Sequence, residues 1–491
     1  MKINKIFIAG IMMLSLVACG DDLDIVPSQQ KVDANLIVDQ KSAETAINGV
    51  YYSYAMCGTD RYDVKSTKCS MYYEILPGDI AGTCTYYQGP YILETHGGSY
   101  YTMYNSYFWT PLYNTINAAN NVIAKMGESE DSWFEGNRKN EIIGEAYCMR
   151  ALVNLQLLVL FGYSWDNSSP YGNILRTDPS SVSTLKTQRS SVADTYDAII
   201  SDLDIAIEKA PANGKNCFAT SWLAKGLKVR ALMQRGQGND YAEAAALAQD
   251  VIQNGPYALE ENVVDVFHKN GLNSQEVIFG IQPKENQVDV TEQYFYRGSA
   301  QWYPSDALTA LYENDPRKSA MVPVIETQSI VIDYETYSYY FVTVQIPVIG
   351  KHFPNAVFSS STLAETQYQM RLTEMYLLRA EALARTGDLN GAKTSLKTVL
   401  AHAGYTDFSF VDAASSQYDV LQQIFNEEVR QFFCESGQDA AMMLRFPSDM
   451  VCAFNPQYAD ITMSIFPIPT DEFRYNAGIS PSDQNPGYSA E

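Results

Sequence analysis

The sequence predicts a mainly α-helical protein in which helix pairs form a scaffold, with long loops and short β-strands inserted between them. Two stretches, residues 221–254 and 370–403, share one layout of a helix, a glycine-containing turn and a second helix. Alanines stand where the two helices of each pair would approach each other. Each stretch spans about 34 residues, the period of a tetratricopeptide helix pair. Since a long segment separates them, we expect no simple solenoid.

The rest of the scaffold is predicted from apolar residues spaced by three and four positions. This spacing predicts further helices over residues 42–55, 109–126, 140–162 and 191–210. The third of these is apolar nearly all round in its second half, so we expect it to be a buried central helix. Alternating apolar and polar residues predict strands over 276–282 and within 329–350.

Two insertions are rich in aromatic residues. Residues 56–106 lose the helical spacing and contain many tyrosines, glycines and threonines, which predicts a long loop region. Residues 255–365 are mixed and include a second glycine-broken aromatic loop at 291–305. Long ordered loops in compact proteins are usually functional, so both insertions are expected to bind the ligand.

The N-terminus has the order of an export leader. Lys2 and Lys5 precede an apolar run that is too short for a permanent membrane span. Leu16, Val17, Ala18 and Cys19 match a bacterial lipobox, in which a lipid is attached to the cysteine thiol. We therefore expect a signal peptide at 1–18, a lipidated acidic tether at 19–34 and a single domain at 35–491, anchored without crossing the membrane. The alternative is an ordinary signal peptide with a chance cysteine.

The composition narrows the classes of ligand and partner that the protein can bind. The 57 acidic residues against 34 basic ones give a net charge of −23, which argues against nucleic acid as a partner. Tyrosine is unusually frequent, with 35 residues, and a tyrosine ring suits faceted polar ligands. The four histidines are far apart and no catalytic motif is present, so we expect no enzyme, no cofactor and no zinc site; a structural calcium ion stays open. Cys57, Cys69 and Cys84 lie in one loop-rich stretch where a disulfide could form in an exported protein.

Several segments, in their order along the chain, carry a family resemblance. They are CGDDLD, WTPLYNTINAANNVI, GEAYCMRALVNLQLLVLFG, ATSWLAKGLKVRAL, NDYAEAAALAQDVIQNGPYAL, EVIFGIQ, NDPRKS, RLTEMYLLRAEAL, IFPIPTDEF and QNPGY. Together they resemble the SusD/RagB family of outer-membrane nutrient-binding lipoproteins of the Bacteroidetes. The resemblance covers nearly the whole mature chain and implies a SusD-like fold.

The chain departs from the family pattern over residues 426–449. A second arginine and an aromatic-plus-aspartate pair of the family are lost there, which leaves the local packing in question. The residues that still match are Asn426, Glu427, Arg430, Glu435, Gly437 and Arg445.

The resemblance implies a function. Family members capture oligosaccharides at the cell surface and deliver them to a SusC-like TonB-dependent transporter, so this chain is expected in the outer membrane, lipid-anchored and facing the exterior. Asp21, Asp22 and Asp24 would then act as an export address as well as a spacer. The alternative is a peptide receptor of the same transporter-lid type. A glycosidase is remote, because no carboxylate pair with the spacing required for hydrolysis can be named.

The ligand residues of the family lie in variable loops, so we choose candidates by chemistry. A sugar ring needs a flat aromatic platform for its C–H face and polar groups for its hydroxyls. Trp302 is the first candidate, and for each aromatic the alternative is a residue packed under its own loop. Trp109, by contrast, opens a helix and is interpreted as structural. The full candidate set is Trp302, Tyr296, Tyr294, Arg297, Tyr303, Tyr86, Tyr87, Tyr91 and Asp79.

Overall fold

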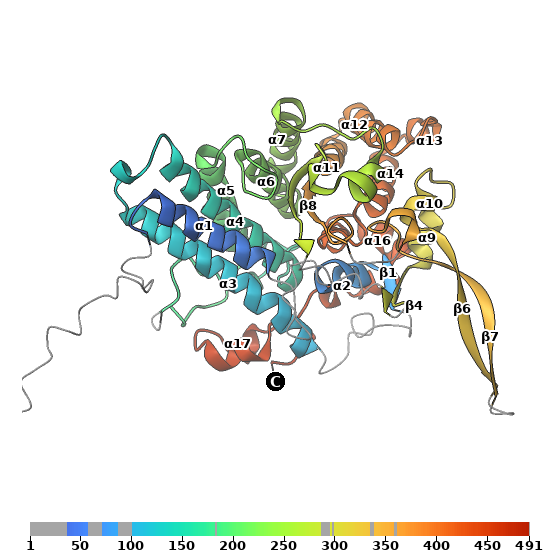
Figure 1. Ribbon diagram of the computed structural model, residues 1–491, viewed down its shortest axis with the longest axis horizontal. Helices are drawn as coiled ribbons and strands as arrows, with labels where there is room; N and C mark the ends of the chain where they lie inside the picture. Colours follow the sequence, from blue (N-terminus) through green and yellow to red (C-terminus); the bar gives the residue numbers. More distant parts are fainter. Residues whose placement is uncertain are drawn as a thin grey trace, which may run out of the picture.

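The structure is a computed structural model, which describes residues 37–56, 71–86, 101–181, 184–285, 295–296, 299–333, 338–357 and 361–490. Helices make up most of the described chain, and the described strands pair only in twos (Figure 1). The predicted mainly α-helical class is therefore confirmed.

Four helices pack together in the N-terminal part. They are α1 (Gln40–Ala55), α3 (Tyr101–Glu128), α4 (Arg138–Phe161) and α5 (Val192–Lys209). Helix α4 contacts each of the other three and is buried along most of its length, as predicted from its apolar composition. Within the described residues, α4 is the one helix long and apolar enough to cross a membrane, and 78% of its most apolar window is buried inside the protein.

The two predicted helix pairs are confirmed and lie next to each other. They are α6 (Ser221–Arg235) with α7 (Asp240–Asn254), and α11 (Leu372–Thr386) with α12 (Leu389–His402). Helix α7 packs against α11, so the array continues across the long insertion that separates the pairs in sequence (Figure 1). Gly236 and Gly387 end α6 and α11 with φ of 59° and 93°, a left-handed conformation that glycine adopts without a Cβ clash.

The C-terminal helices close the array. Helix α14 packs against α11 and α12, and its first turn is held by a capping box between Ser416 and Asp419. The elements of this part are α13 (Ser409–Ala413), α14 (Gln417–Phe432), α15 (Gln438–Met443), α16 (Ser448–Phe454) and α17 (Thr470–Tyr475).

The insertion between α7 and α11 contains short helices and strands. Strand β2 (Val277–Ile281), which was predicted, pairs antiparallel with β8 (Gln367–Arg371). The second predicted strand region forms a hairpin of β6 (Val324–Asp333) and β7 (Ser338–Pro347), which projects from the body in Figure 1. The helices here are α8 (Val263–Asp265), α9 (Asp306–Leu311) and α10 (Lys318–Met321).

A buried ionic cluster joins this insertion to the helical array. Arg371 donates to Glu276 Oε1 and to Glu435 Oε1, each at 2.7 Å, and all three side chains are buried. Burial alone would raise the pKa of Glu276, but the hydrogen bond from His402 and the positive charge of Arg371 outweigh it and lower the pKa to about 2. Glu435 is one of the family-matching residues of the divergent stretch, and it keeps a structural role.

The prediction of one long loop over residues 56–106 is wrong in part. Helix α2 (Met71–Ala81) lies within it, and α3 begins at Tyr101 rather than at Trp109. Ile75, Leu76 and Ile80 of α2 are buried. Pro77 stands inside α2, and few polar residues mark an outer face, so the sequence shows no clear helical period there.

Candidate functional site

The structure brings the two predicted aromatic segments together. Strand β1 (Cys84–Tyr86), from the first insertion, pairs antiparallel with β5 (Trp302–Pro304), from the second. Tyr86 lies opposite Trp302 and Thr85 opposite Tyr303. The ladder continues at its end, because the Ser305 amide donates to the Thr83 carbonyl at 3.0 Å.

A surface cleft of about 520 Å³ lies beside this strand pair and is called the β1–β5 cleft below. Its walls come from α2, β1, β5, the start of α9, the end of β7 and the segment after α16. In Figure 1, α2, β1, α9 and the base of the β6–β7 hairpin meet in this region. Its lining includes Asp79, Thr85, Tyr303, Asp306, Asn455 and Gln457.

One wall of the β1–β5 cleft is held rigidly by Asn455. Its Nδ2 atom donates to the Ile80 carbonyl at 3.0 Å, and its Oδ1 atom accepts from the Gln457 amide at 3.1 Å. Gly82, with φ of 75°, lies so close that an added Cβ would be 2.7 Å from Asn455 Nδ2. The end of α2 and the segment after α16 are thus locked together, so this wall is preformed.

The floor beneath the strand pair is polar but buried. Thr83 Oγ1 donates to Asp439 Oδ2 at 2.9 Å, and the Cys434 amide donates to the same oxygen at 3.0 Å. Burial nevertheless raises the pKa of Asp439 to about 6, because removal of water disfavours the charged carboxylate. Asp79, which was predicted to pair with ligand hydroxyls, lines the cleft but is only 1% exposed.

The aromatic residues of the strand pair divide into two groups. Tyr303 lines the cleft and is half-buried, and Tyr86 is half-buried on β1. Trp302 is 1% exposed, and its ring packs against that of Tyr86 with centroids 5.2 Å apart. The prediction of Trp302 as the principal exposed platform is therefore wrong in this structure. Its ring supports the strand pair from beneath, which is the packed alternative considered above.

The remaining predicted residues are placed in part or not at all. The backbone of Tyr296 belongs to β3 (Phe295–Tyr296), which pairs with β4 (Ser299–Ala300), but its side chain is outside the description. Five predicted residues lie outside the described residues: Tyr87, Tyr91, Tyr294, Arg297 and Cys19. Their roles stay predictions.

Three polar residues of the cleft were missed by sequence reasoning. Asp306 opens α9, while Asn455 and Gln457 follow α16. Asn455 and Gln457 stand in the short stretch FNPQY, whose Asn-Pro pair indicates a turn but no ligand. They reach the cleft only through tertiary packing.

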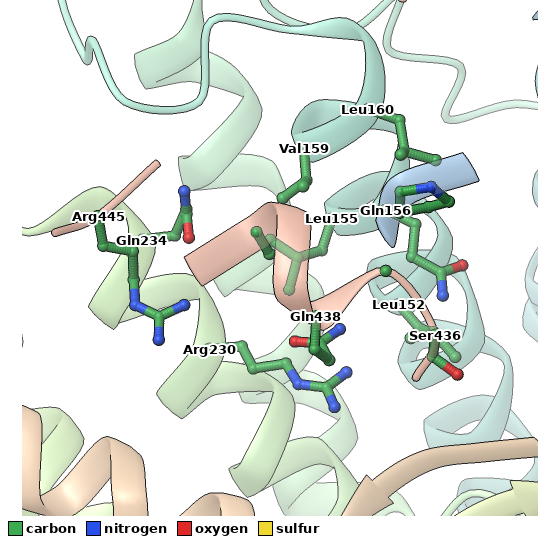
Figure 2. A pocket seen from close by; sticks show the side chains of 13 residues that line it. Leu152, Leu155, Gln156, Val159, Leu160, Arg230, Gln234, Ser436, Gln438 and Arg445 are labelled. Carbon is green, nitrogen blue, oxygen red and sulfur yellow. The ribbon is translucent and has the colours of Figure 1, made fainter. Parts of the chain in front are cut away.

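Two other hollows have different characters. Figure 2 shows an internal cavity between α4, α6 and α15, with Arg230 and Gln438 at its edge; its volume of about 40 Å³ suits a few waters and no sugar ring. A groove of about 260 Å³ lies beside Trp109, whose Nε1 donates to Glu472 at 3.0 Å. Trp109 is 5% exposed, so its predicted structural role is confirmed. Among the residues the structure describes, no group of three or more His, Cys, Asp or Glu side chains could hold a metal ion.

Comparison with known proteins identifies the family. A sequence model described as "Starch-binding associating with outer membrane" matches residues 37–226, and one described as "SusD family" matches residues 327–439. The chain belongs to the SusD family. A SusD-like protein of Bacteroides ovatus is 24% identical over 295 residues, which is 57% of this chain and half the length of that relative.

Solved structures of SusD superfamily proteins share the fold, as does one structure described with an oligosaccharide. A SusD superfamily protein of Parabacteroides distasonis superposes with a TM-score of 0.72 at 18% identity, covering 92% of this chain and all of that one. One of Bacteroides thetaiotaomicron gives 0.69 at 22% identity, covering 91% and 100%. A structure described with a xylogluco-oligosaccharide gives 0.65 at 20% identity, covering 85% and 86%.

Proposed function

We propose that this SusD-family protein captures oligosaccharides at the cell surface in the β1–β5 cleft and delivers them to a TonB-dependent transporter of the outer membrane. The observation that carries the proposal is the pairing of the two aromatic insertions, far apart in sequence, along one cleft. The role is binding without catalysis.

The chemistry of the β1–β5 cleft fits a sugar. Tyr303 offers a ring that can cover the C–H face of a pyranose, since water hydrates that face poorly. Asp306 and Gln457, both exposed, supply a carboxylate and an amide for the hydroxyls. The locked wall at Asn455 reduces the ordering that binding requires, which favours affinity.

The comparisons support the same class of ligand. One family model that matches this chain is described as starch-binding, and one structural neighbour is described with a xylogluco-oligosaccharide. Those descriptions concern the other proteins. At identities of 18–22% they support the fold and leave the particular glycan to experiment.

Isothermal titration against a panel of polysaccharides and peptides tests the proposal. For the glycan that binds, Tyr303→Ala should weaken affinity about 2- to 10-fold, because one aromatic stacking contact contributes about 0.5–1.5 kcal/mol. Tyr52→Ala is the matched control, since Tyr52 is a 60% exposed tyrosine on α1 and should leave affinity unchanged. Unaltered glycan affinity of the Tyr303→Ala variant would contradict the assignment of the β1–β5 cleft as the glycan-binding site.

Peptide capture is the second candidate, and one observation favours it. In the described residues β1 and β5 form a two-stranded sheet, so an extended peptide could add to an outer edge by main-chain hydrogen bonds. Saturable binding of peptides with no binding of any glycan would establish this candidate. Release of shortened sugars during incubation would instead indicate catalysis.

The anchor and the partner need separate tests. Cys19→Ala should release the protein from the membrane fraction if the thiol carries the lipid. Replacement of Asp21, Asp22 and Asp24 by alanine should remove surface labelling of intact cells if the acidic run is an address. Copurification with a TonB-dependent barrel from the native outer membrane tests the transporter, and isolation of the lipoprotein alone under mild detergent would count against it.

A further inference from the structure

Two cysteines from distant parts of the chain meet beneath the β1–β5 cleft. Cys84 lies in β1 and Cys434 lies in the turn between α14 and α15, and the two side chains are 1% and 0% exposed. Both cysteines are free thiols in the structure, and the Cys84 thiol lies within hydrogen-bonding reach of Cys434. Along the sequence, Cys84 lies near Cys57 and Cys69 instead, so this partner arises only from the tertiary fold.

The surrounding hydrogen bonds fix the two cysteines relative to each other. Thr83, the neighbour of Cys84, and the amide of Cys434 both donate to Asp439 Oδ2, at 2.9 and 3.0 Å. One carboxylate oxygen therefore holds the side chain of Thr83 and the backbone of Cys434, although 356 residues separate Thr83 from Asp439. Such a shared acceptor keeps the cysteines together in every folded molecule.

The space around the thiols is closely shaped. A Cβ added to Gly78 would lie 3.1 Å from Cys84 Sγ and 3.2 Å from Asp439 Oδ2. A side chain at position 78 would therefore crowd the Cys84 sulfur. Cys434 has a positive φ of 49°, a conformation that costs energy for residues other than glycine. A side chain kept at such a position needs a compensating contact, and a bond to Cys84 would provide it.

We propose that Cys84 and Cys434 form a disulfide that fastens strand β1 of the cleft to the turn between α14 and α15. This cross-link requires export to an oxidising compartment, which the predicted leader would provide, and it does not depend on which ligand the cleft binds. Its consequence for binding is preorganisation, because β1 could not move away from the helical array.

The reaction is a thiol–disulfide exchange with an external protein disulfide of that compartment. One cysteine thiolate attacks a sulfur of the external disulfide, forming a mixed disulfide and releasing one thiol of the oxidant. The second cysteine thiolate then attacks the first cysteine's sulfur and releases the other thiol. Two protons and two electrons leave the pair, and the oxidant becomes a dithiol. Burial raises the pKa of Cys84 in the folded protein, so the exchange should precede complete burial.

Peptide mapping of the full chain tests the proposal. The protein, exported under its own leader, is denatured without reductant, alkylated, digested and analysed by mass spectrometry. We expect a Cys84–Cys434 cross-linked peptide that disappears after reduction. Cys148, buried in α4, is the internal control and should be alkylated without reduction. Alkylation of both Cys84 and Cys434 before reduction, or a link from Cys84 to Cys57 or Cys69, would overturn the proposal.

Single substitutions give a second measurement. Cys84→Ser should make Cys434 alkylatable without reduction, and Cys434→Ser should do the same for Cys84. Reductant should lower the Tm of the wild-type protein and leave that of either variant unchanged. A Tm of the wild type that is indifferent to reductant would contradict the cross-link. Loss of glycan binding with an intact cross-link would count against the proposed function alone.

Discussion

Gly144 lets two helices of the N-terminal array meet at their backbones. A Cβ added there would lie 2.2 Å from the Ala210 amide nitrogen, at the end of α5. Gly144→Ala should therefore lower the free energy of unfolding by about 2–3 kcal/mol, as overpacking against a fixed backbone does. Urea unfolding measures the change.

Gly49 provides the matched control for this substitution. It lies inside α1, and nothing lies within 4 Å of its added Cβ. Gly49→Ala should raise the free energy of unfolding by about 0.5–1 kcal/mol, because alanine has the higher helix propensity. Equal effects of the two substitutions would show that Gly144 is not a close-approach site.

Arg371 is a buried cation that is shared by two buried carboxylates, each of which would lose its guanidinium partner. Glu276 and Glu435 both accept hydrogen bonds from it, and none of the three side chains is more than 3% exposed. Arg371→Met should cost about 3–5 kcal/mol of unfolding free energy. Arg474→Met, at an arginine that is 71% exposed, should change stability by less than about 0.5 kcal/mol. Similar midpoints in thermal melts of both variants would contradict this assignment.

At the scale of an element, a capping box between Ser416 and Asp419 holds the start of α14. Ser416 accepts from the Asp419 amide, and the Asp419 side chain accepts from the Ser416 amide. Ser416→Ala should lower the free energy of unfolding by about 1 kcal/mol. Ser416→Asp keeps a hydrogen-bond acceptor and should therefore retain most of the stabilisation that the cap contributes. Chemical denaturation of both variants separates capping from general surface effects, and a loss equal in both would exclude the cap.

The elements differ in how far the sequence predicts them. The helix pairs could be predicted because their signals are local: apolar spacing, close-packing alanines and the turn glycine Gly387. Helix α2 could not be predicted, since Pro77 and the scarcity of polar residues hide its helical period. The pairing of β1 with β5 was not predicted, because no local pattern encodes a contact between strands so far apart.

The candidate site shows the same division. Tyrosine-rich composition pointed to two segments that the structure brings together, but composition cannot distinguish a ring on the surface from one under it. Trp302 is buried because β5 turns that side chain toward Tyr86, whereas its neighbour Tyr303 faces the cleft. Asn455 enters the site through its bond to Ile80, a tertiary contact with no trace in its own segment.

At the scale of the whole molecule, buried carboxylates set the response to acid. Burial alone would raise the pKa of Glu427, but the positive charges of Arg317 and Arg430 outweigh it and lower the pKa to about 2, as for Glu276. The unfolded chain then binds more protons than the native one between pH 4.5 and 2. Stability from these groups is therefore present above about pH 4.5 and is lost as the pH falls toward 2.

Urea midpoints at pH 5, 4 and 3 measure this loss, and we expect the main fall between pH 4 and pH 3, because the raised pKa of Asp439 opposes the fall above pH 4. Glu427→Gln should be less stable at pH 5 yet show a smaller fall, because one of the titrating groups is gone. The Asp439 carboxyl acts in the opposite direction between about pH 4 and 6, since its pKa is raised. Midpoints that stay constant from pH 5 to pH 3 would contradict the ionic clusters.

The contact between α7 and α11 also determines the order in which the molecule can be completed. Helix α7 ends at Asn254 and packs against α11, which begins only at Leu372. During synthesis, the surface of α7 that packs against α11 therefore stays exposed until α11 has been made. Closure of so distant a pair is slow, and the waiting surface is prone to association. Because the two helix pairs form one array, the N-terminal half cannot complete its packing before the second pair is present.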